Sequence, residues 1–384
     1  MTVDPDLLTI EADQAAAVGD IRLARCLLEQ IAVANPEHPQ IWLKLAAMHR
    51  AAGDVDRATS AVHRALAAAP LDFTALLLRA SLLERRGDPS ADEAYGRALA
   101  QRPEGDLPPT VAAALAHADR RHEVHLVKRA AILGEAVAPT LLAPDEKARI
   151  DRFHSNALRR TVPFHSEPTH FHYPGLVERE FHDRSDFPWL TELEAATDAI
   201  AAEFEVLAAA NDTESAPYIQ YADHEPVNQW RALNHSRDWT AIHLFRNGET
   251  VTDNIRQCPR TMDVLSRIPQ PWITGCSANA MFSLLSPGTT IPPHTGVSNT
   301  RLVCHLPLIV PQGCWFRVGA ETREWTRGDA FVFDDTIEHE AANPTALPRV
   351  VLILDVWHPG LSEAEREAVR RSMEAEVRMS GSIS

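Results

Sequence analysis

Three residues in the last third of the chain have types and settings suited to chemistry: His294, His339 and Arg349. The histidines are 45 residues apart (339 − 294), which excludes a site built on one helix, such as the HExxH pattern. Pro292-Pro293 stiffens the approach to His294, and Thr295-Gly296 after it allows close access. Arg349 opens an apolar run, and an arginine that enters a core needs an anion, because an unpaired buried charge is costly. A dicarboxylate ligand would supply that anion through a two-pronged guanidinium pair.

The stretch from Ser283 to Val350 contains the strands that would hold these side chains. From Arg301 to Val310 apolar residues alternate with the others, which is the period of a half-buried strand: Leu302, Cys304, Leu306, Leu308 and Val310. Ala330–Phe333 and Val350–Leu354 are further apolar runs of strand length. Turn residues break the strands at Pro287-Gly288, Pro311-Gln312-Gly313 and Arg327-Gly328-Asp329. This pattern predicts a β-sandwich or jelly roll, with the two histidines meeting at its mouth.

Other polar residues invite a metal-site interpretation that their spacing does not support. Four clustered histidines match no ligand pattern, so we expect them at the surface or between domains: His165, His170, His172 and His182. Asp334-Asp335 is interpreted as a turn in which one aspartate orients a histidine or caps the backbone, with a carboxylate ligand as the alternative. His358 is a weaker candidate for a third ligand.

Composition and charge limit the class of protein. A chain of 384 residues is long enough for two or three domains, and its net charge of −16 argues against nucleic acid or an anionic membrane as the main partner. The first residues lack a basic segment followed by an apolar core, so we expect no signal peptide; we also expect no membrane span. The five cysteines form no CxxC pair, which favours reduced thiols and a cytoplasmic location.

The first hundred residues repeat. Three Gly-Asp pairs lie 34 residues apart (53 − 19 and 87 − 53), at Gly19-Asp20, Gly53-Asp54 and Gly87-Asp88. Prolines close the units at Pro36, Pro70 and Pro103. A 34-residue helix–turn–helix period with a small residue in the turn is typical of tetratricopeptide repeats, although an ordinary helical bundle is the alternative. We therefore predict repeats over residues 1–103, in a solenoid whose concave face binds peptide.

The rest of the chain is expected to contain a helical connector and a β-domain. Residues 104–160 would cap the solenoid, with helical pieces at Val111–Ala118, Lys128–Gly134 and Pro144–Arg159. Residues 161–384 would form the β-domain. Within this domain, one amphipathic helix over Trp189–Ala210 would precede the strands.

Four segments of the β-domain together resemble the aspartyl/asparaginyl β-hydroxylase family. They read NHSRDWTAIHLFRNGE, PPHTGVSNTRL, GDAFVFDDTIEHE and PRVVLILDVWHP, and the resemblance runs from about Tyr173 to Leu361. Members of that family are iron(II)- and 2-oxoglutarate-dependent oxygenases on a double-stranded β-helix, the jelly-roll form. The resemblance therefore implies this fold and a requirement for iron(II), 2-oxoglutarate and O2. Animal members also carry a tetratricopeptide region before the oxygenase domain.

The resemblance implies roles for individual residues around the metal and the co-substrate. The family's two iron ligands fall on His294 and His339. The arginine that pairs with the distal carboxylate of 2-oxoglutarate falls on Arg349, and a serine that assists it falls on Ser283. Most oxygenases of this class add a carboxylate ligand. The family resembled here has glycine at that position, as this chain has at Gly296.

Further matches concern the pocket walls. His305 matches a histidine beside the co-substrate, Trp239 matches a pocket tryptophan, and Arg301 matches one of two arginines on the strand, which would contact substrate. The second arginine is replaced by Val303, and two family cysteines near the substrate channel are replaced by Ile255 and Met262. The resemblance thus implies the oxidative chemistry but does not identify the substrate.

These matches predict a hydroxylase acting on an unactivated carbon. The leading interpretation is a protein or peptide hydroxylase of the β-carbon of Asp or Asn, with the repeats presenting the substrate. One alternative is a hydroxylase of lipid A acyl chains or of another small molecule, although no membrane anchor or basic amphipathic helix is visible. The other is an inactive oxygenase domain in a tetratricopeptide scaffold, against which His294, His339 and Arg349 together argue.

Overall fold

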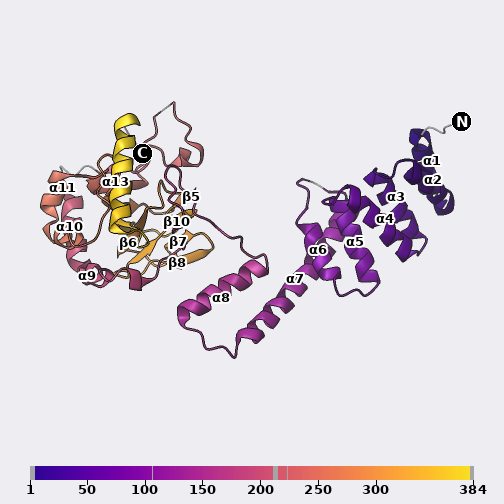
Figure 1. Cartoon of the computed structure of the whole chain (residues 1–384), viewed down its shortest axis with the longest axis horizontal. Helices are drawn as coiled ribbons and strands as arrows, with labels where there is room; N and C mark the ends of the chain where they lie inside the picture. Colours follow the sequence, from indigo (N-terminus) through magenta and orange to yellow (C-terminus); the bar gives the residue numbers. More distant parts are fainter. Residues whose placement is uncertain (1–4, 106, 211–214, 223, 381–384) are drawn as a thin grey trace. The chain divides into compact units, whose positions relative to one another are not determined.

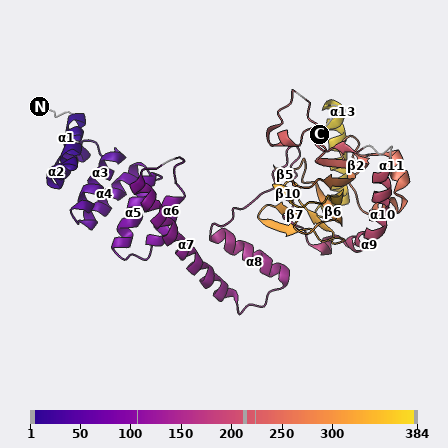
Figure 2. The ribbon, with the colours of Figure 1, turned by 180° about the vertical axis from the view of Figure 1, so that it is seen from behind.

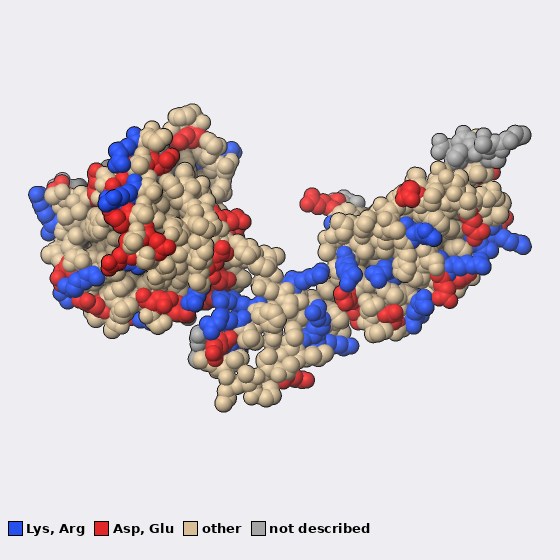
Figure 3. All heavy atoms as spheres, in the orientation of Figure 1, with Lys and Arg blue, Asp and Glu red and all other residues tan. Residues whose placement is uncertain are grey.

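The structure is a computed structural model that describes residues 5–105, 107–210, 215–222 and 224–380. The chain divides into two compact units, Met1–Arg160 and Thr161–Ser384 (Figure 1). The first unit is helical and the second is rich in antiparallel β-sheet. On the face drawn in Figure 3, acidic and basic side chains are interspersed over both units rather than gathered by sign.

Six helices of the first unit form three helix–turn–helix pairs. They are α1 (Pro5–Ala17), α2 (Ile21–Ala34), α3 (Pro39–Ala51), α4 (Val55–Ala68), α5 (Phe73–Arg85) and α6 (Ala91–Leu99). Gly19, Gly53 and Gly87 lie in the turns with φ of 81°, 79° and 66°, a backbone conformation that a Cβ would penalise. Asp20 and Asp54 then cap the next helices by accepting from Leu23 N and Arg57 N. The glycines therefore lie in the turns, as the repeat period predicted, and in the first two pairs the aspartate also starts the next helix.

Helices α7 (Pro109–Val137) and α8 (Pro144–Ala157) complete this unit. Leu115 and Ala118 of α7 are buried, and α7 packs on α6. The prediction of two separate helical pieces within residues 111–134 was wrong. The polar residues between them interrupt the apolar pattern, but they include no proline or glycine that would break the backbone.

Two antiparallel sheets form the centre of the second unit. The seven-stranded sheet has the order β1-β2-β4-β11-β6-β9, with β3 paired to β2, and the four-stranded sheet has the order β5-β10-β7-β8. The strands of the larger sheet are β1 (Ala216–Pro217), β2 (Trp239–Arg246), β3 (Glu249–Thr250), β4 (Ala280–Leu285), β6 (Arg301–Ile309), β9 (Phe331–Phe333) and β11 (Arg349–Trp357). Those of the smaller sheet are β5 (Thr289–His294), β7 (Trp315–Val318), β8 (Glu321–Glu324) and β10 (His339–Asn343). The three predicted strands are β6, β9 and β11, whereas the double-stranded β-helix winding stays a prediction.

The larger sheet has two different faces. Its even-numbered β6 residues, including Leu302 and Leu306, join a core with helices on one side. These helices include α9 (Leu190–Ala195), α10 (Thr197–Ala209), α11 (Thr252–Gln257) and α12 (Pro259–Leu265), which lie together along one side of the unit (Figures 1 and 2). The odd-numbered β6 residues Arg301, Val303 and His305 face the smaller sheet and the space between the sheets. The predicted alternation of β6 is therefore confirmed, but the strand is buried on both faces rather than half-buried, because the smaller sheet covers its odd-numbered side.

The single helix predicted over Trp189–Ala210 is two helices. The chain leaves helical hydrogen bonding at Ala196, where Thr197 Oγ1 donates instead to Glu194 O at 2.6 Å.

Short 3-10 turns lie at Arg184–Asp186 and Asn228–Ala232, and α13 (Glu363–Ser380) packs Val369 and Met373 against Ile273. Among the helices in the described part of the chain, none combines the length and apolar character that a membrane crossing requires.

Candidate active site

A cavity of about 410 Å³ lies between the two sheets of the second unit. It is lined by residues of β2, β4, β6 and β11 on one side and of β5, β7 and β10 on the other. All seven residues singled out from the sequence line it: Trp239, Ser283, His294, Arg301, His305, His339 and Arg349. Residues spread over more than a hundred positions of sequence thus meet in one place.

His294 and His339 are opposite one another in the ladder between β5 and β10. Their ring centroids are 4.0 Å apart. His294 Nδ1 is 2.8 Å from Pro292 O, and His339 Nδ1 is 3.1 Å from Ile337 O. A carbonyl oxygen only accepts, so each Nδ1 carries the proton and each Nε2 keeps its lone pair. This tautomer, fixed by a backbone carbonyl, is the usual state of a metal-ligating histidine.

Burial keeps this pair neutral. It lowers the pKa of His294, and it lowers the pKa of His339 well below its ordinary value, with a further contribution from His294. Neutral imidazole is the form that binds metal ions. Among the described residues no group of three or more His, Cys, Asp or Glu side chains is arranged to hold a metal ion. The donor set available here is therefore two imidazole nitrogens.

Gly296 lies where a longer side chain would meet the Asp335 carboxylate. A Cβ built on Gly296 would overlap Asp335 Oδ2, so the carboxylate occupies the volume that a side chain at 296 would need. Asp335 is only 6% exposed, and burial raises the pKa of its carboxyl to about 6 against the lowering effect of Arg301. Asp334 behaves differently, because it accepts from Thr336 N at 2.9 Å and from Thr336 Oγ1 at 2.5 Å.

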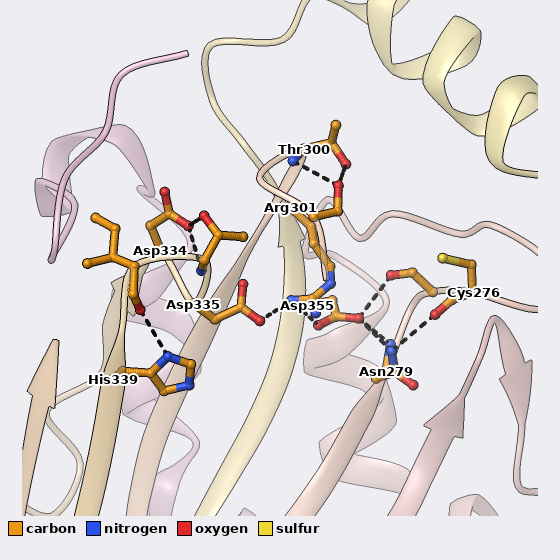
Figure 4. Close-up of polar contacts among 12 residues, drawn as sticks. Cys276, Asn279, Thr300, Arg301, Asp334, Asp335, His339 and Asp355 are labelled. Atoms are coloured by element: carbon orange, nitrogen blue, oxygen red, sulfur yellow. Dashed lines mark hydrogen bonds and ion pairs between the residues drawn. The ribbon is translucent and has the colours of Figure 1, made fainter. Parts of the chain in front are cut away.

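The turn interpretation of Asp334-Asp335 is thus correct for Asp334, which caps the backbone. Neither aspartate orients His339, because the partner of His339 Nδ1 is Ile337 O. Asp335 instead forms an ion pair with Arg301, at 3.0 Å from Oδ2 to Nη1 (Figure 4). Nothing in the sequence distinguished the two aspartates, because the difference depends on which of them faces β6.

Arg349 is a buried cation without a carboxylate partner among the described residues. Its side chain is 2% exposed, its Nε has no hydrogen-bond partner, and Nη1 makes only long contacts, at 3.4 Å to Ser283 Oγ and 3.5 Å to Ser283 O. Its guanidinium lies 4.8 Å from the centre of the Trp325 ring, a cation–π arrangement. Burial lowers the pKa of Arg349 to about 10. The site is therefore built to receive an anion.

The neighbours of Arg349 are the residues expected there. Trp239 Nε1 donates to Ser283 Oγ at 3.0 Å and so fixes the serine beside the guanidinium. His305 is 6% exposed, and burial, followed by the nearby Arg349 charge, lowers its pKa well below its ordinary value. Its Nδ1 has no hydrogen-bond partner. A ligand beside Arg349 would find a neutral imidazole and a hydroxyl within the same pocket.

Unpaired polar atoms concentrate in this cavity. In the described part of the chain, eleven buried side-chain nitrogen or oxygen atoms lack a hydrogen-bond partner. Six of them belong to cavity-lining residues: His243, Arg301, His305, Trp325, Asp335 and Arg349. Of these, the Arg301 atom, Nη1, still makes ion pairs with Asp335 and Asp355. Buried polar groups are normally satisfied, so this concentration marks a place where a ligand completes the hydrogen bonding.

Several candidate residues lie elsewhere. His358 packs edge-on against His182, with ring centroids 5.2 Å apart, and its Nδ1 accepts from Gly360 N at 3.0 Å. His165, His170 and His172 are exposed, as expected, but His182 is buried, and the prediction of a surface or interdomain position for it was wrong. His182 follows the apolar Phe181, which inserts among the aromatic residues of β7 and β9.

The sequence reasoning missed several cavity residues. Asp355 on β11 bonds Arg301, Tyr218 stacks on Trp239 with centroids 3.8 Å apart, and Trp230 packs edge-on against His294 at 4.9 Å. The alternation of β11 could have pointed to Asp355, because it shares the face of Arg349. No local signal places Tyr218, which follows β1, or Trp230, which lies in the 3-10 turn at Asn228–Ala232.

Comparison with known proteins agrees with this geometry. Residues 194–359 match the model of the family described as aspartyl/asparaginyl beta-hydroxylase, and residues 39–82 match a tetratricopeptide repeat. Similar proteins include the "Aspartate beta-hydroxylase domain-containing protein 2" of Mus musculus, 34% identical over 54% of this chain and 54% of that protein. Another is the "Aspartyl/asparaginyl beta-hydroxylase" of Homo sapiens, 35% identical over 36% of this chain and 18% of that protein.

The matched region thus spans about half the length of the first relative and less of the second. Among solved structures, the Yersinia enterocolitica type III secretion chaperone SycD in complex with a peptide of the translocator YopD is similar to 32% of this chain and 92% of its own. That likeness, at 16% identity and a TM-score of 0.29, is too low to carry an argument. The cavity and its histidine pair lie within residues 194–359, and this part of the chain is therefore similar to the aspartyl/asparaginyl beta-hydroxylase family, while residues 39–82 are similar to a tetratricopeptide repeat.

Proposed function

We propose that the second unit is an iron(II)- and 2-oxoglutarate-dependent oxygenase that hydroxylates an unactivated carbon, the β-carbon of Asp or Asn in a protein or peptide. The observation that carries the proposal is the buried Arg349 guanidinium, which has no carboxylate partner in the described structure and lies in the same cavity as the histidine pair. A buried cation is stable only when an anion accompanies it. A dicarboxylate that also reaches the histidines would supply the anion that Arg349 needs and would lie beside the histidine pair.

The donor set fits the metal implied by the family. His294 and His339 would hold iron(II) through their Nε2 atoms, because their Nδ1 atoms are bound to backbone carbonyls. Two imidazoles leave several coordination positions for the co-substrate, water and O2. The bound metal and 2-oxoglutarate would supply the oxidising chemistry, with one oxygen atom of O2 entering succinate and the other the substrate.

The protein's own residues position the reactants and exclude water. Arg349 and Ser283 would bind the distal carboxylate of 2-oxoglutarate, and Trp239 holds Ser283 in place. Trp325 covers the guanidinium, and Phe316 and Phe333 pack around His305 with ring centroids 5.1 Å and 4.9 Å from it. This aromatic enclosure strengthens every charge interaction within it, because it lowers the local dielectric constant.

The repeats suit a role in recruiting a peptide substrate. Tetratricopeptide solenoids commonly bind peptides along their concave face, and the repeat region lacks any residue of the cavity. The five free cysteines accord with a reducing compartment such as the cytoplasm.

The proposal is tested by loading the full chain with iron(II) under argon, adding 2-oxoglutarate and then admitting O2. Succinate should form slowly alone and faster with peptides from a cell extract. The matched control is His339→Ala, which should form none. Absence of 2-oxoglutarate binding by the iron-loaded wild type would refute the proposal.

A further inference from the structure

The strand register divides the cavity into an inner half at the Arg349 end of β11 and an outer half at the Asp355 end. Arg349 and Asp355 both lie on β11 and face the cavity, six residues apart, so about 20 Å of strand separates them. The inner half holds Arg349 and Ser283, which are 2% and 0% exposed. The outer half holds Arg301, Asp335 and Asp355, together with the exposed Arg246 at its rim.

Arg301, the buried cation of the outer half, is already neutralised by the protein. Its Nη1 lies 3.0 Å from Asp335 Oδ2 and 3.3 Å from Asp355 Oδ1. Figure 4 shows the guanidinium held between these two carboxylates, which come from different strands and loops. The side chain of Arg301 is only 16% exposed. It has little capacity left for a third carboxylate.

Asp355 is fixed so that it cannot easily release Arg301. Its Oδ2 accepts from Ser277 Oγ at 2.9 Å, from Asn279 N at 2.8 Å and from Asn279 Nδ2 at 2.8 Å. The carboxylate is 4% exposed. Three donors on one oxygen hold this buried carboxylate in place. A substrate carboxylate would have to displace it.

The charges of the loaded site balance without any substrate charge, an argument that rests on the proposed function. Iron(II) and Arg349 would meet the two carboxylates of 2-oxoglutarate, and Arg301 meets Asp335 and Asp355, so the four positive and four negative charges of the loaded site sum to zero. Glu340, which also lines the cavity, is bound by Arg317 at 2.5 Å. Arg246 at the rim is exposed, and water screens its charge. A carboxylate that reached the histidines would therefore be a buried charge without a partner, which is unfavourable.

The outer half instead offers hydrogen-bonding partners to a neutral group. Asp335 Oδ1 is a buried acceptor without a hydrogen-bond partner, while Asp335 Oδ2 is the oxygen that pairs with Arg301. His243 adds an unpaired Nδ1, and its burial lowers its pKa to about 4, so that the ring is uncharged near neutral pH. A carboxamide has both the donor and the acceptor that these atoms require, whereas a carboxylate only accepts.

We propose that the outer half of the cavity selects a carboxamide side chain over a carboxylate, and that Asp335 and Asp355 set this preference by neutralising Arg301. Val303 supports the same conclusion, because the strand position two residues from Arg301 supplies no second cation. The preferred residue in a peptide is then asparagine rather than aspartate.

The test uses two probes that differ only in this group, N-acetyl-asparagine methylamide and N-acetyl-aspartate methylamide. The full chain is loaded with manganese(II) and 2-oxoglutarate under argon, and binding is followed by the fluorescence of the cavity tryptophans, which include Trp230 and Trp239. The asparagine probe should bind at least about tenfold more tightly. In Asp355→Asn, which leaves Arg301 with one carboxylate, the preference should fall to about threefold or less.

If circular dichroism shows that Asp355→Asn is unfolded, the same comparison of the two probes is made with Asp335→Asn, which removes the other carboxylate that pairs with Arg301. Equal or tighter binding of the aspartate probe by the wild type would overturn the inference, and so would binding of neither probe by a chain saturated with 2-oxoglutarate. A wild type that binds 2-oxoglutarate but prefers aspartate loses only this inference. A wild type that does not bind 2-oxoglutarate loses the proposed function itself.

Discussion

Replacing Arg349 should weaken 2-oxoglutarate binding without lowering the stability of the ligand-free protein. In the ligand-free protein the guanidinium is buried beside Ser283 and Trp325 with no anion, and burial lowers its pKa to about 10. A shift of that size corresponds to about 3 kcal/mol of cost for keeping the charge buried. The contact with the Trp325 ring returns up to about 2 kcal/mol. Arg349→Gln should therefore leave the ligand-free protein as stable as the wild type or more stable by about 1 kcal/mol.

The same substitution should nearly abolish 2-oxoglutarate binding. Loss of a buried, charge-assisted contact costs about 2–5 kcal/mol, or about 30- to 5000-fold in affinity. Arg349→Lys keeps the charge but not the planar fork, so its affinity should fall between those of the wild type and Arg349→Gln. Metal binding by the histidine pair should survive in both variants, because neither histidine bonds to Arg349.

Thermal unfolding of the full chain with and without 2-oxoglutarate measures both effects. At a ligand concentration of about 100 times Kd the wild type should gain about 2.7 kcal/mol. For the 224 residues of the second unit (384 − 161 + 1) this raises Tm by about 5–10 °C. Arg349→Gln should show no such shift. The matched control is Arg327→Gln, whose side chain is 50% exposed and pairs with Asp198 outside the cavity. A full shift in Arg349→Gln would refute the placement of the co-substrate.

Three further predictions concern the metal, the domain boundary and pH. His294→Ala or His339→Ala should abolish iron binding, measured by metal analysis after dialysis, together with 2-oxoglutarate decarboxylation; full activity in His339→Ala would contradict the ligand assignment. A fragment beginning at Thr161 should fold and consume 2-oxoglutarate, because the second unit has its own core; an insoluble or iron-free fragment would show that the helical unit is needed. His182, whose pKa burial lowers to about 3, is neutral when folded but gains a proton below about 6.5 when unfolded, so stability should fall as pH drops from 6.5 towards 3, by up to about 1.4 kcal/mol per pH unit. His182→Gln should flatten this acid dependence in urea titrations, and an unchanged slope would contradict a buried neutral imidazole.

The local pattern of the sequence determined the elements that depend on neighbouring residues. The Gly-Asp repeat predicted the turns of the first unit, because a positive φ at glycine is a property of a few adjacent residues, whereas the aspartate caps were not predicted. The alternation from Arg301 onward predicted β6 and its two faces, since successive side chains of any strand point to opposite sides. The same alternation placed His305 and Arg301 on one face.

Helix boundaries were less well determined, because local polarity and backbone continuity are different properties. The polar middle of α7 suggested a gap where the helix continues, and the uniform composition of Trp189–Ala210 hid the break at Ala196. Short strands without a strong apolar pattern, such as β5 and β10, were not predicted as strands, although they carry the two histidines. Their pairing depends on partners distant in the sequence.

The identities of the histidine pair and of Arg349 could be predicted from the sequence, but the charge balance around them could not. Asp335 and Asp355 lie 34 and 54 residues beyond Arg301, and only the packing of a loop and of β11 against β6 brings both carboxylates to its guanidinium (335 − 301 and 355 − 301). The sequence by itself determined which side chains could bind a metal and an anion. The tertiary structure decided that one arginine remains unpaired and the other does not, because ion pairing depends on distances that register and burial set rather than on residue type.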